Sequence, residues 1–269
     1  VLNWIESAVF MKFGLLKYLL ALLSLALIRY RKKKIVWMLH NIHPHQGENW
    51  VTRATERYLY RHADLIVTHS QEAAKYARVR AKCDVIYACH PIEKIKIDDY
   101  QESVTPCDIL IWGTVLPYKG IYELLCQECI KASGLRIRII GVCKDRTLED
   151  KINSRCNDKI TYENRKISFS ELKASIINSR HVLFPYVGTS VSSSGALMDT
   201  IVMGGTPVGP NIGAFHDLNE EGVCLTYNDY PEIVNLAKNK TGIKEEKRNS
   251  FISQNSWKSF AQMLYQKLK

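Results

Sequence analysis

The sequence lacks an apolar run long enough to cross a bilayer. The uncharged stretch after Lys17 covers only residues 18–28, well short of the roughly 20 residues that a spanning helix needs. The first residues, beginning at Val1, do not have the charged, apolar and small-residue layout of a signal peptide. Low-complexity tracts are also missing. The 269 residues therefore predict a globular protein with one large domain or two of ordinary size.

The cysteines do not form a spaced framework. Eight are scattered along the chain, and several, including Cys83, Cys143 and Cys224, stand in apolar runs. Reduced, buried thiols in a cytoplasmic protein are the expected state. Cys126 and Cys129 form a lone CxxC pair, without a second pair or histidines at a spacing that suits zinc. No metal site is predicted.

Acidic residues are in deficit. The chain has 27 of them against 37 basic residues, which gives a net charge of +10. Such an excess favours an anionic partner, such as nucleic acid, an acidic membrane surface or a phosphorylated substrate. The sequence has no RNA- or DNA-binding motif and no stripe of alternating basic and aromatic residues, so nucleic acid is not an expected partner.

A strongly apolar helix is predicted over residues 11–28, and a basic run, 29–34, follows it. Two interpretations stay open: a helix buried against a sheet, or a helix lying in a membrane interface with a basic flank. The second makes an anionic membrane surface a partner of residues 11–34. It predicts peripheral attachment at the inner face of the plasma membrane.

Short apolar strands alternate with helices along the rest of the chain. We expect strands at residues 35–40, 65–68, 85–88, 109–112, 136–140, 159–162, 181–184, 206–209 and 222–226. We expect helices at residues 52–62, 71–79, 122–132, 148–152, 170–178, 195–203, 231–238 and 257–268. Continuous apolar strands separated by helices are typical of parallel sheets covered on both faces.

A polar stretch, residues 92–106, interrupts this alternation and is interpreted as a linker. The predicted fold class is α/β, with two Rossmann-like doubly wound domains that face a cleft. Residues 1–98 form the N-terminal domain and residues 99–255 the C-terminal domain. The helix in residues 256–269 is expected to pack back on the N-terminal domain. Ligands of such sheets bind at the carboxyl ends of the strands.

The segment 184–210 has the layout of a phosphate site: a strand, a loop of Ser and Gly residues, and a helix N-terminus. The first turn of a helix offers unpaired N–H groups and a positive dipole end. Gly195 permits close backbone approach, and Ser193 and Ser194 add hydroxyl donors. Asp199, one turn into the helix, is placed to bind sugar hydroxyls. An ordinary strand–helix connection with a serine N-cap remains the alternative.

Five segments in order resemble motifs of GT-B-fold glycosyltransferases of family 4, of the type that builds bacterial surface polysaccharides. They are residues 37–45 (WMLHNIHPH), 63–70 (ADLIVTHS), 85–91 (VIYACHP), 113–120 (GTVLPYKG) and 184–210. The resemblance covers nearly the whole chain. It also implies that an opening β-α-β unit precedes Val1, so that the N-terminal domain is incomplete here.

The resemblance implies a role for each matching residue on the donor side. Gly113 and Lys119 lie in the segment that holds the donor diphosphate. Backbone amides of Ser193, Ser194 and Gly195 bind the same phosphates. Asp199 binds the ribose of the nucleotide.

On the acceptor side, the resemblance makes His40 the catalytic residue near the transferred sugar. It places His43 and His45 in a loop that faces the acceptor. The sequence departs from the family pattern at three positions. Val191 stands where the family has an acid, Thr114 replaces an arginine, and position 199 carries Asp in place of Glu.

The implied activity is hexosyl transfer from a UDP- or GDP-sugar to a lipid-linked or saccharide acceptor of capsule or exopolysaccharide synthesis. The family reaction retains the configuration at C1 and needs neither a metal nor a cofactor. The missing acid keeps two alternatives open. One is a non-catalytic GT-B-like partner subunit, and the other is a nucleotide-sugar epimerase or an inverting transferase with a base such as Glu48.

Overall fold

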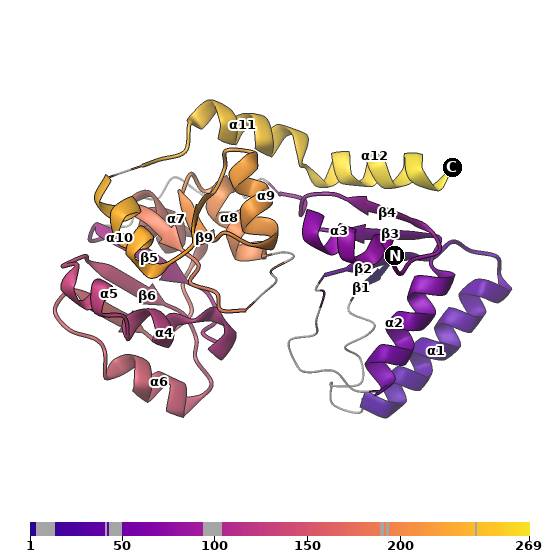
Figure 1. Cartoon of the computed structure of the whole chain (residues 1–269), viewed down its shortest axis with the longest axis horizontal. Helices are drawn as coiled ribbons and strands as arrows, with labels where there is room; N and C mark the ends of the chain where they lie inside the picture. Colours follow the sequence, from indigo (N-terminus) through magenta and orange to yellow (C-terminus); the bar gives the residue numbers. More distant parts are fainter. Residues whose placement is uncertain are drawn as a thin grey trace. The chain divides into compact units, whose positions relative to one another are not determined.

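The structure is a computed structural model that describes residues 1–3, 14–40, 42, 50–93, 104–188, 191, 194–239 and 241–269. The chain divides into two compact units, each with its own sheet and helices (Figure 1). The N-terminal unit combines Val1–His90 with Lys258–Lys269, and the C-terminal unit combines Pro91–Thr189 with Ser194–Trp257. The chain returns to the N-terminal unit at helix α12 (Trp257–Leu268), nearly all of which belongs to that unit.

The N-terminal unit is built on four parallel strands. They are β1 (Leu2–Asn3), β2 (Val36–Leu39), β3 (Leu65–Thr68) and β4 (Asp84–Tyr87), and they lie side by side in chain order. Every residue of β2 and β3 is buried. Because helices cover both faces of these strands, their sequences are continuous apolar runs rather than alternating ones.

Three helices cover one face of this sheet, namely α1 (Gly14–Tyr30), α2 (Trp50–His62) and α3 (Gln71–Arg78). Trp37 is fully buried beneath them, and its ring meets Tyr60 of α2 edge-on, with 5.0 Å between centroids. Leu25 of α1 is buried in the same cluster. In the part of the chain that the structure describes, no helix is long and apolar enough to cross a membrane.

Helix α12 covers the opposite face. Phe260 and Leu264 pack against the buried side chains of Val36 and Val67. Since successive residues of a strand point to opposite faces, Val36 and the neighbouring Trp37 belong to different clusters. The core of the N-terminal unit is thus completed by a segment from the far end of the sequence.

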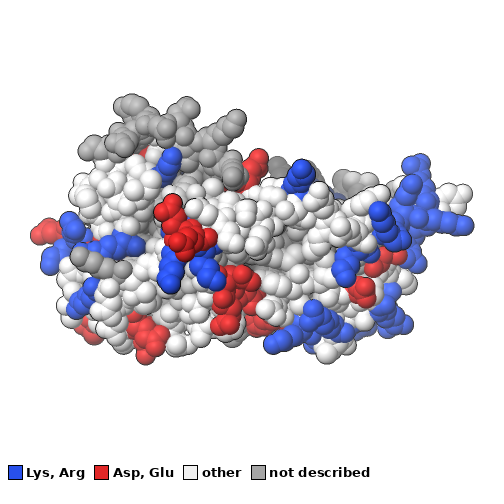
Figure 2. All heavy atoms as spheres, turned by 90° about the horizontal axis from the view of Figure 1, so that it is seen from above, with Lys and Arg blue, Asp and Glu red and all other residues white. Residues whose placement is uncertain are grey.

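Basic side chains gather at one end of the N-terminal unit, where α1 finishes (Figure 2). The exposed residues there are Arg29, Arg31, Lys32, Lys33 and Lys34. Lys34 Nζ also donates to the carbonyl of Leu268, so the end of α12 lies beside this basic run.

The C-terminal unit is built on six parallel strands in the order β10-β9-β8-β5-β6-β7. They are β5 (Cys107–Trp112), β6 (Ile137–Ile140), β7 (Ile160–Glu163), β8 (Ser179–Leu183), β9 (Pro207–Pro210) and β10 (Leu225–Tyr227). The chain starts in the middle at β5, fills one side, and then returns to β8 and fills the other. This is the Rossmann strand order, and its switch point lies between β5 and β8.

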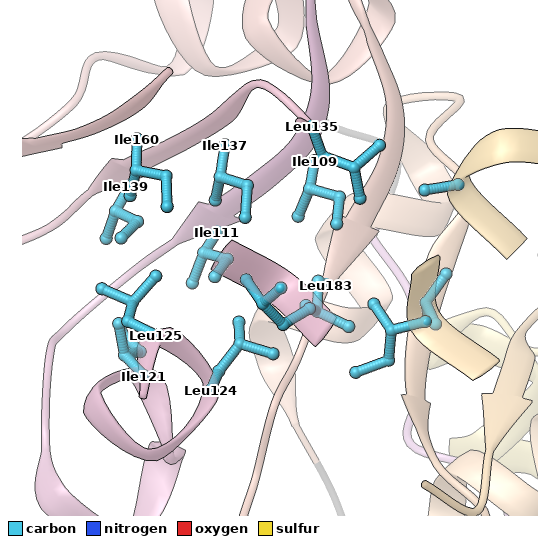
Figure 3. Close-up of a cluster of buried hydrophobic side chains, with 14 of the residues drawn as sticks. Ile109, Ile111, Ile121, Leu124, Leu125, Leu135, Ile137, Ile139, Ile160 and Leu183 are labelled. Carbon is cyan, nitrogen blue, oxygen red and sulfur yellow. The ribbon is translucent and has the colours of Figure 1, made fainter. Parts of the chain in front are cut away.

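Eight α-helices of this unit lie among the described residues. They are α4 (Ile121–Leu125), α5 (Glu128–Ala132), α6 (Arg146–Asn153), α7 (Phe169–Ile177), α8 (Gly195–Val202), α9 (Gly213–Glu220), α10 (Tyr230–Asn239) and α11 (Glu245–Gln254). Figure 3 shows the core, in which Ile109, Ile111 and Ile139 of the sheet face Leu124 and Leu125 of α4. All five are at most 3% exposed, so these side chains form a closely packed core between the sheet and α4.

The predicted fold class is confirmed, because both units are α/β with parallel sheets of the Rossmann kind. The single helix predicted over residues 122–132 is wrong. The chain breaks after α4, where Gln127 adopts an extended backbone (φ −72°, ψ 130°) and starts α5. Because of this break, the CxxC pair is divided: Cys126 ends one helix and Cys129 lies in the next.

Helices α9 and α11 were not predicted from the sequence. The strand expected at residues 222–226 is shorter and shifted to Leu225–Tyr227, because the preceding residues form the turn that ends α9. The start of the helix predicted at residue 11 and most of the linker, residues 94–103, lie outside the described residues.

Candidate functional site

The loops after β5 and β8 leave the sheet of the C-terminal unit at its switch point. Residues Gly113–Gly120 follow β5, and residues 184–188 follow β8. Because neighbouring parallel strands end at the same edge of a sheet, both loops lie at the carboxyl edge. Open α/β sheets bind their ligands in the crevice at this point.

Glycines allow the backbones at this edge to come close. Gly113 ends β5 with φ +102°, a conformation that side chains disfavour. A Cβ on Gly141, which follows β6, would lie 1.8 Å from the carbonyl oxygen of Gly113. A Cβ on Gly120 (φ +65°) would lie 2.1 Å from the carbonyl oxygen of Pro185. Glycine is therefore required where the loop after β5 crosses its two neighbours.

A hydrogen bond fixes the two loops to each other. The N–H of Val187 donates to the carbonyl of Tyr118 at 2.9 Å. A single 3₁₀ turn, Pro117–Lys119, ends at Gly120 and sets the direction of the lysine side chain. Lys119 Nζ then lies 5.8 Å from the centroid of the Tyr186 ring. This is within the range of a cation–π contact.

Helix α8 begins beside this pair of loops. Ser194 is its N-cap, and the Ser194 hydroxyl accepts from the N–H of Leu197. The hydroxyl of Tyr186 lies 3.3 Å from the same oxygen, so the tyrosine joins the helix N-terminus to Lys119. No described residue accepts a hydrogen bond from the N–H of Gly195 or Ala196. These are the orphan donors that an anion binds at a helix N-terminus.

Lys119 is a partly buried cation. Burial lowers the pKa of its amine to about 8, and no other cause contributes. No carboxylate among the described residues forms an ion pair with it. A buried charge without a counter-ion is costly. Among the described residues, Lys119 and the N-terminus of α8 therefore form a positively polarised site that no carboxylate neutralises.

Asp199 lies one turn further along α8 and is partly buried. Burial raises the pKa of its carboxyl. No described cation forms an ion pair with it. Its oxygens are hydrogen-bond acceptors, the chemistry that ribose hydroxyls require. The anion-binding donors and this acceptor are thus separated by one helical turn.

A cavity of about 420 Å³ at the opposite, amino-terminal edge of this sheet is a different feature. Much of its charged lining is internally paired. Arg138 donates to Glu163 at 2.8 Å and to Glu171 at 3.1 Å. Arg165 donates to the same two carboxylates, and this lowers the pKa of both. These ion pairs give the charges of Arg138, Glu163 and Glu171 a structural role.

In the N-terminal unit, three histidines stand at the ends of consecutive strands. His40 follows β2, His69 follows β3 and His90 follows β4. The ring centroids of His40 and His69 are 5.5 Å apart, and those of His69 and His90 are 5.1 Å apart. His40 Nε2 also lies 3.4 Å from the side-chain oxygen of Asn3.

The imidazoles of His40 and His69 are uncharged at neutral pH. Burial, with repulsion from His90, lowers the pKa of His40 to about 4. Burial also lowers the pKa of His69 to about 4, although its hydrogen bond to the carbonyl of Ala88 opposes the shift. At 2.8 Å from that carbonyl, His69 Nδ1 must be the donor, which leaves Nε2 as an acceptor.

The predicted donor-side residues come together in the C-terminal unit. Gly113, Lys119, Ser194 and Gly195 line the switch point, and Asp199 follows on α8. Ser193, His43 and His45 lie outside the described residues, and so does Glu48. His40 lies in the N-terminal unit.

Sequence reasoning missed Tyr186 and His69. Tyr186 is partly buried, and burial raises the pKa of its phenol to about 12, so it acts as a neutral hydrogen-bonding group. A Pro-Tyr pair directly after a buried strand was the available signal. For His69, the signal was its position at the end of the strand next to that of His40. Among the described residues, no group of three or more His, Cys, Asp or Glu is arranged to hold a metal ion.

The two Rossmann-like units define a fold class, that of the GT-B glycosyltransferases. No family model matches the sequence, and no curated protein matches it. Solved structures do. Sucrose-phosphate synthase from Thermosynechococcus elongatus has a TM-score of 0.66 at 12% identity, over 88% of this chain and 68% of that one.

A glycosyltransferase from Rickettsia africae has a TM-score of 0.66 at 12% identity, over 90% of this chain and 72% of that one. An α,α-trehalose-phosphate synthase (UDP-forming) from Burkholderia vietnamiensis has a TM-score of 0.60 at 11% identity, over 83% of this chain and 63% of that one. The chain thus spans roughly two thirds of the length of these structures. The similarity confirms the GT-B fold predicted from the sequence.

Proposed function

We propose that this chain binds a nucleotide-diphosphate sugar in its C-terminal unit and transfers the hexosyl group to a saccharide acceptor. The observation that carries the proposal is the partly buried Lys119 amine, which has no carboxylate partner among the described residues. It lies against Tyr186, whose hydroxyl contacts the N-cap of α8. A diphosphate would supply the missing negative charge and accept from the open amides of Gly195 and Ala196.

The same groups suit the chemistry of sugar transfer. When the bond between C1 and the diphosphate breaks, negative charge grows on the leaving phosphate. Lys119 and the N-terminus of α8 are preorganised to stabilise that charge, which is the main catalytic task in such a reaction. Asp199 would hold the ribose and so orient the nucleotide along α8. The similarity to a UDP-forming trehalose-phosphate synthase favours UDP as the nucleotide.

For the acceptor side, the proposal rests on His40. A neutral imidazole at a strand end accepts a hydrogen bond from a sugar hydroxyl, and its low pKa keeps it neutral at physiological pH. By resemblance, the reaction retains the configuration at C1, and the leaving phosphate helps to remove the proton of the acceptor. We propose a lipid-linked saccharide of capsule or exopolysaccharide synthesis as the acceptor, at the cytoplasmic face of the membrane.

A second candidate is a nucleotide-binding partner subunit without catalysis. The observation that favours it is Val191, an apolar residue where the family pattern places an acid. An alkyl side chain cannot exchange a proton or accept a bond from a sugar. Both candidates share the donor site, and only turnover separates them.

Calorimetric titration with UDP and with GDP tests the donor site. We expect micromolar to millimolar binding of one nucleotide, and roughly 10- to 100-fold weaker binding by Lys119→Met, which keeps the apolar stem but removes the charge. Lys238→Met, on the exposed side of α10, is the matched control and should bind normally. Absence of binding to both nucleotides refutes the proposal. Binding without hydrolysis or transfer of any UDP- or GDP-sugar selects the non-catalytic candidate.

A further inference from the structure

Helix α1 exposes an unusual amount of apolar surface. Five of its leucines are 50 to 59% exposed, namely Leu16, Leu19, Leu20, Leu23 and Leu27. They recur at spacings of three and four residues, so they form one continuous stripe along the helix. We call these five residues the leucine stripe. Tyr30, 85% exposed, continues it at the C-terminal end of the helix.

The leucine stripe is not the face by which α1 packs on its own sheet. Leu25 is buried and Ile28 is partly buried in the core of the N-terminal unit. Position 25 lies nine residues after position 16, which is half a turn away on a helix of 3.6 residues per turn. The helix is therefore apolar on both sides, and only one side is covered by the described residues.

Cations flank the leucine stripe and no acid accompanies it. Residues 14–34 contain Lys17, Arg29, Arg31, Lys32, Lys33 and Lys34, and they contain no Asp or Glu. The basic run at the end of α1 is exposed (Figure 2). Within these residues every charge is positive, so the surface is complementary to an anionic partner that is also apolar.

We propose that the leucine stripe and its basic run dock on an anionic lipid bilayer, with α1 lying in the interface parallel to the surface. Leucines enter the boundary between head groups and acyl chains, while Arg and Lys stay at the phosphate level. A second copy of the chain is a poorer occupant, since it would bring the same cations and no acid on this helix to meet them. The inference does not depend on the proposed function.

The first experiment is flotation of the full chain with vesicles of phosphatidylcholine, with and without about 30% phosphatidylglycerol. We expect binding to the anionic vesicles only, and release as salt rises to about 0.5 M. Equal binding to both vesicle types overturns the proposal, as does absence of binding to the anionic ones.

Two variants divide the apolar part from the charged part. Leu20→Gln/Leu23→Gln/Leu27→Gln keeps good helix formers and removes the middle of the stripe. Each leucine is already half covered, so we expect roughly a fivefold loss per residue and about a hundredfold in all. Phe169→Gln/Ile177→Gln, on the exposed face of α7, is the matched control and should bind as the parent does.

The charge variant is Arg31→Gln/Lys32→Gln/Lys33→Gln, which spares the contact of Lys34. At roughly fivefold per cation near an anionic surface, we expect about a hundredfold weaker binding. Its control removes three exposed lysines of the C-terminal unit, Lys238, Lys244 and Lys247. If the controls lose binding as much as the stripe and charge variants, non-specific charge attraction overturns the proposal. If the stripe variant changes only the mass in sedimentation, a second copy is the occupant instead.

Discussion

Replacing Lys119 with Met is expected to stabilise the ligand-free protein while it weakens nucleotide binding. The pKa of the amine falls from 10.5 to about 8 on folding, because the charged form loses water and no described carboxylate pairs with it. At about 1.4 kcal/mol per pKa unit, the buried charge costs up to about 3 kcal/mol of unfolding free energy near neutral pH. Methionine has a similar shape and carries no such cost.

The pH dependence of this gain has a defined sign. The folded pKa lies below the unfolded one, so the unfolded chain binds more protons between pH 8 and pH 10.5. The parent protein therefore gains stability through that window, and Lys119→Met does not. The difference in unfolding free energy is largest below pH 8 and closes towards pH 10.5. Urea denaturation of the C-terminal unit in the parent and in Lys119→Met, at pH 7 and at pH 9.5, measures this difference in unfolding free energy.

Binding responds in the opposite direction. A diphosphate needs the protonated amine, so the affinity for UDP is expected to fall about tenfold from pH 7 to pH 9, with proton uptake near pH 8. Calorimetric titrations in two buffers of different ionisation enthalpy measure the number of protons taken up on UDP binding. A Lys119→Met variant that is less stable than the parent at pH 7 and binds UDP as tightly refutes the argument. Burial of the Lys119 charge would then not destabilise the protein, and the amine would not bind the diphosphate.

Three further results are expected. Gly120→Ala should lower the free energy of unfolding by about 2–4 kcal/mol in urea denaturation, because its Cβ would clash with the Pro185 carbonyl at positive φ. Asp199→Asn should weaken UDP binding several-fold in calorimetry and leave pyrophosphate binding unchanged. The N-terminal unit should lose stability as pH falls from about 6.5 to about 4, where only the unfolded chain protonates His40 and His69, and His69→Asn should reduce that loss in circular dichroism.

Much of the fold was predictable because its signals are local. Buried parallel strands such as β3 are short apolar runs, and helices such as α3 begin at a serine cap and end within a residue of the prediction. Helix α11 gave no such signal. Its ten residues are polar on almost every side, and only Phe251 is buried, so no apolar period marks it. The break before Gln127 has neither glycine nor proline.

The candidate site was predictable only in part, because some of its members depend on strand order. Lys119, Ser194 and Asp199 belong to segments whose pattern indicates a function. The contact of Tyr186 with Ser194 depends on how the loop after β8 meets α8. Likewise, His69 lies beside His40 only because β2 and β3 are neighbours in the sheet.

The return of the chain to its first unit has a consequence for synthesis on the ribosome. Lys34 and its contact at Leu268 are 234 residues apart, and the sheet face that includes Val36 stays open until α12 has emerged. The C-terminal unit, by contrast, has all its strands before that point. We therefore expect the later-made unit to fold first. The nascent N-terminal sheet would meanwhile be the natural client of a chaperone.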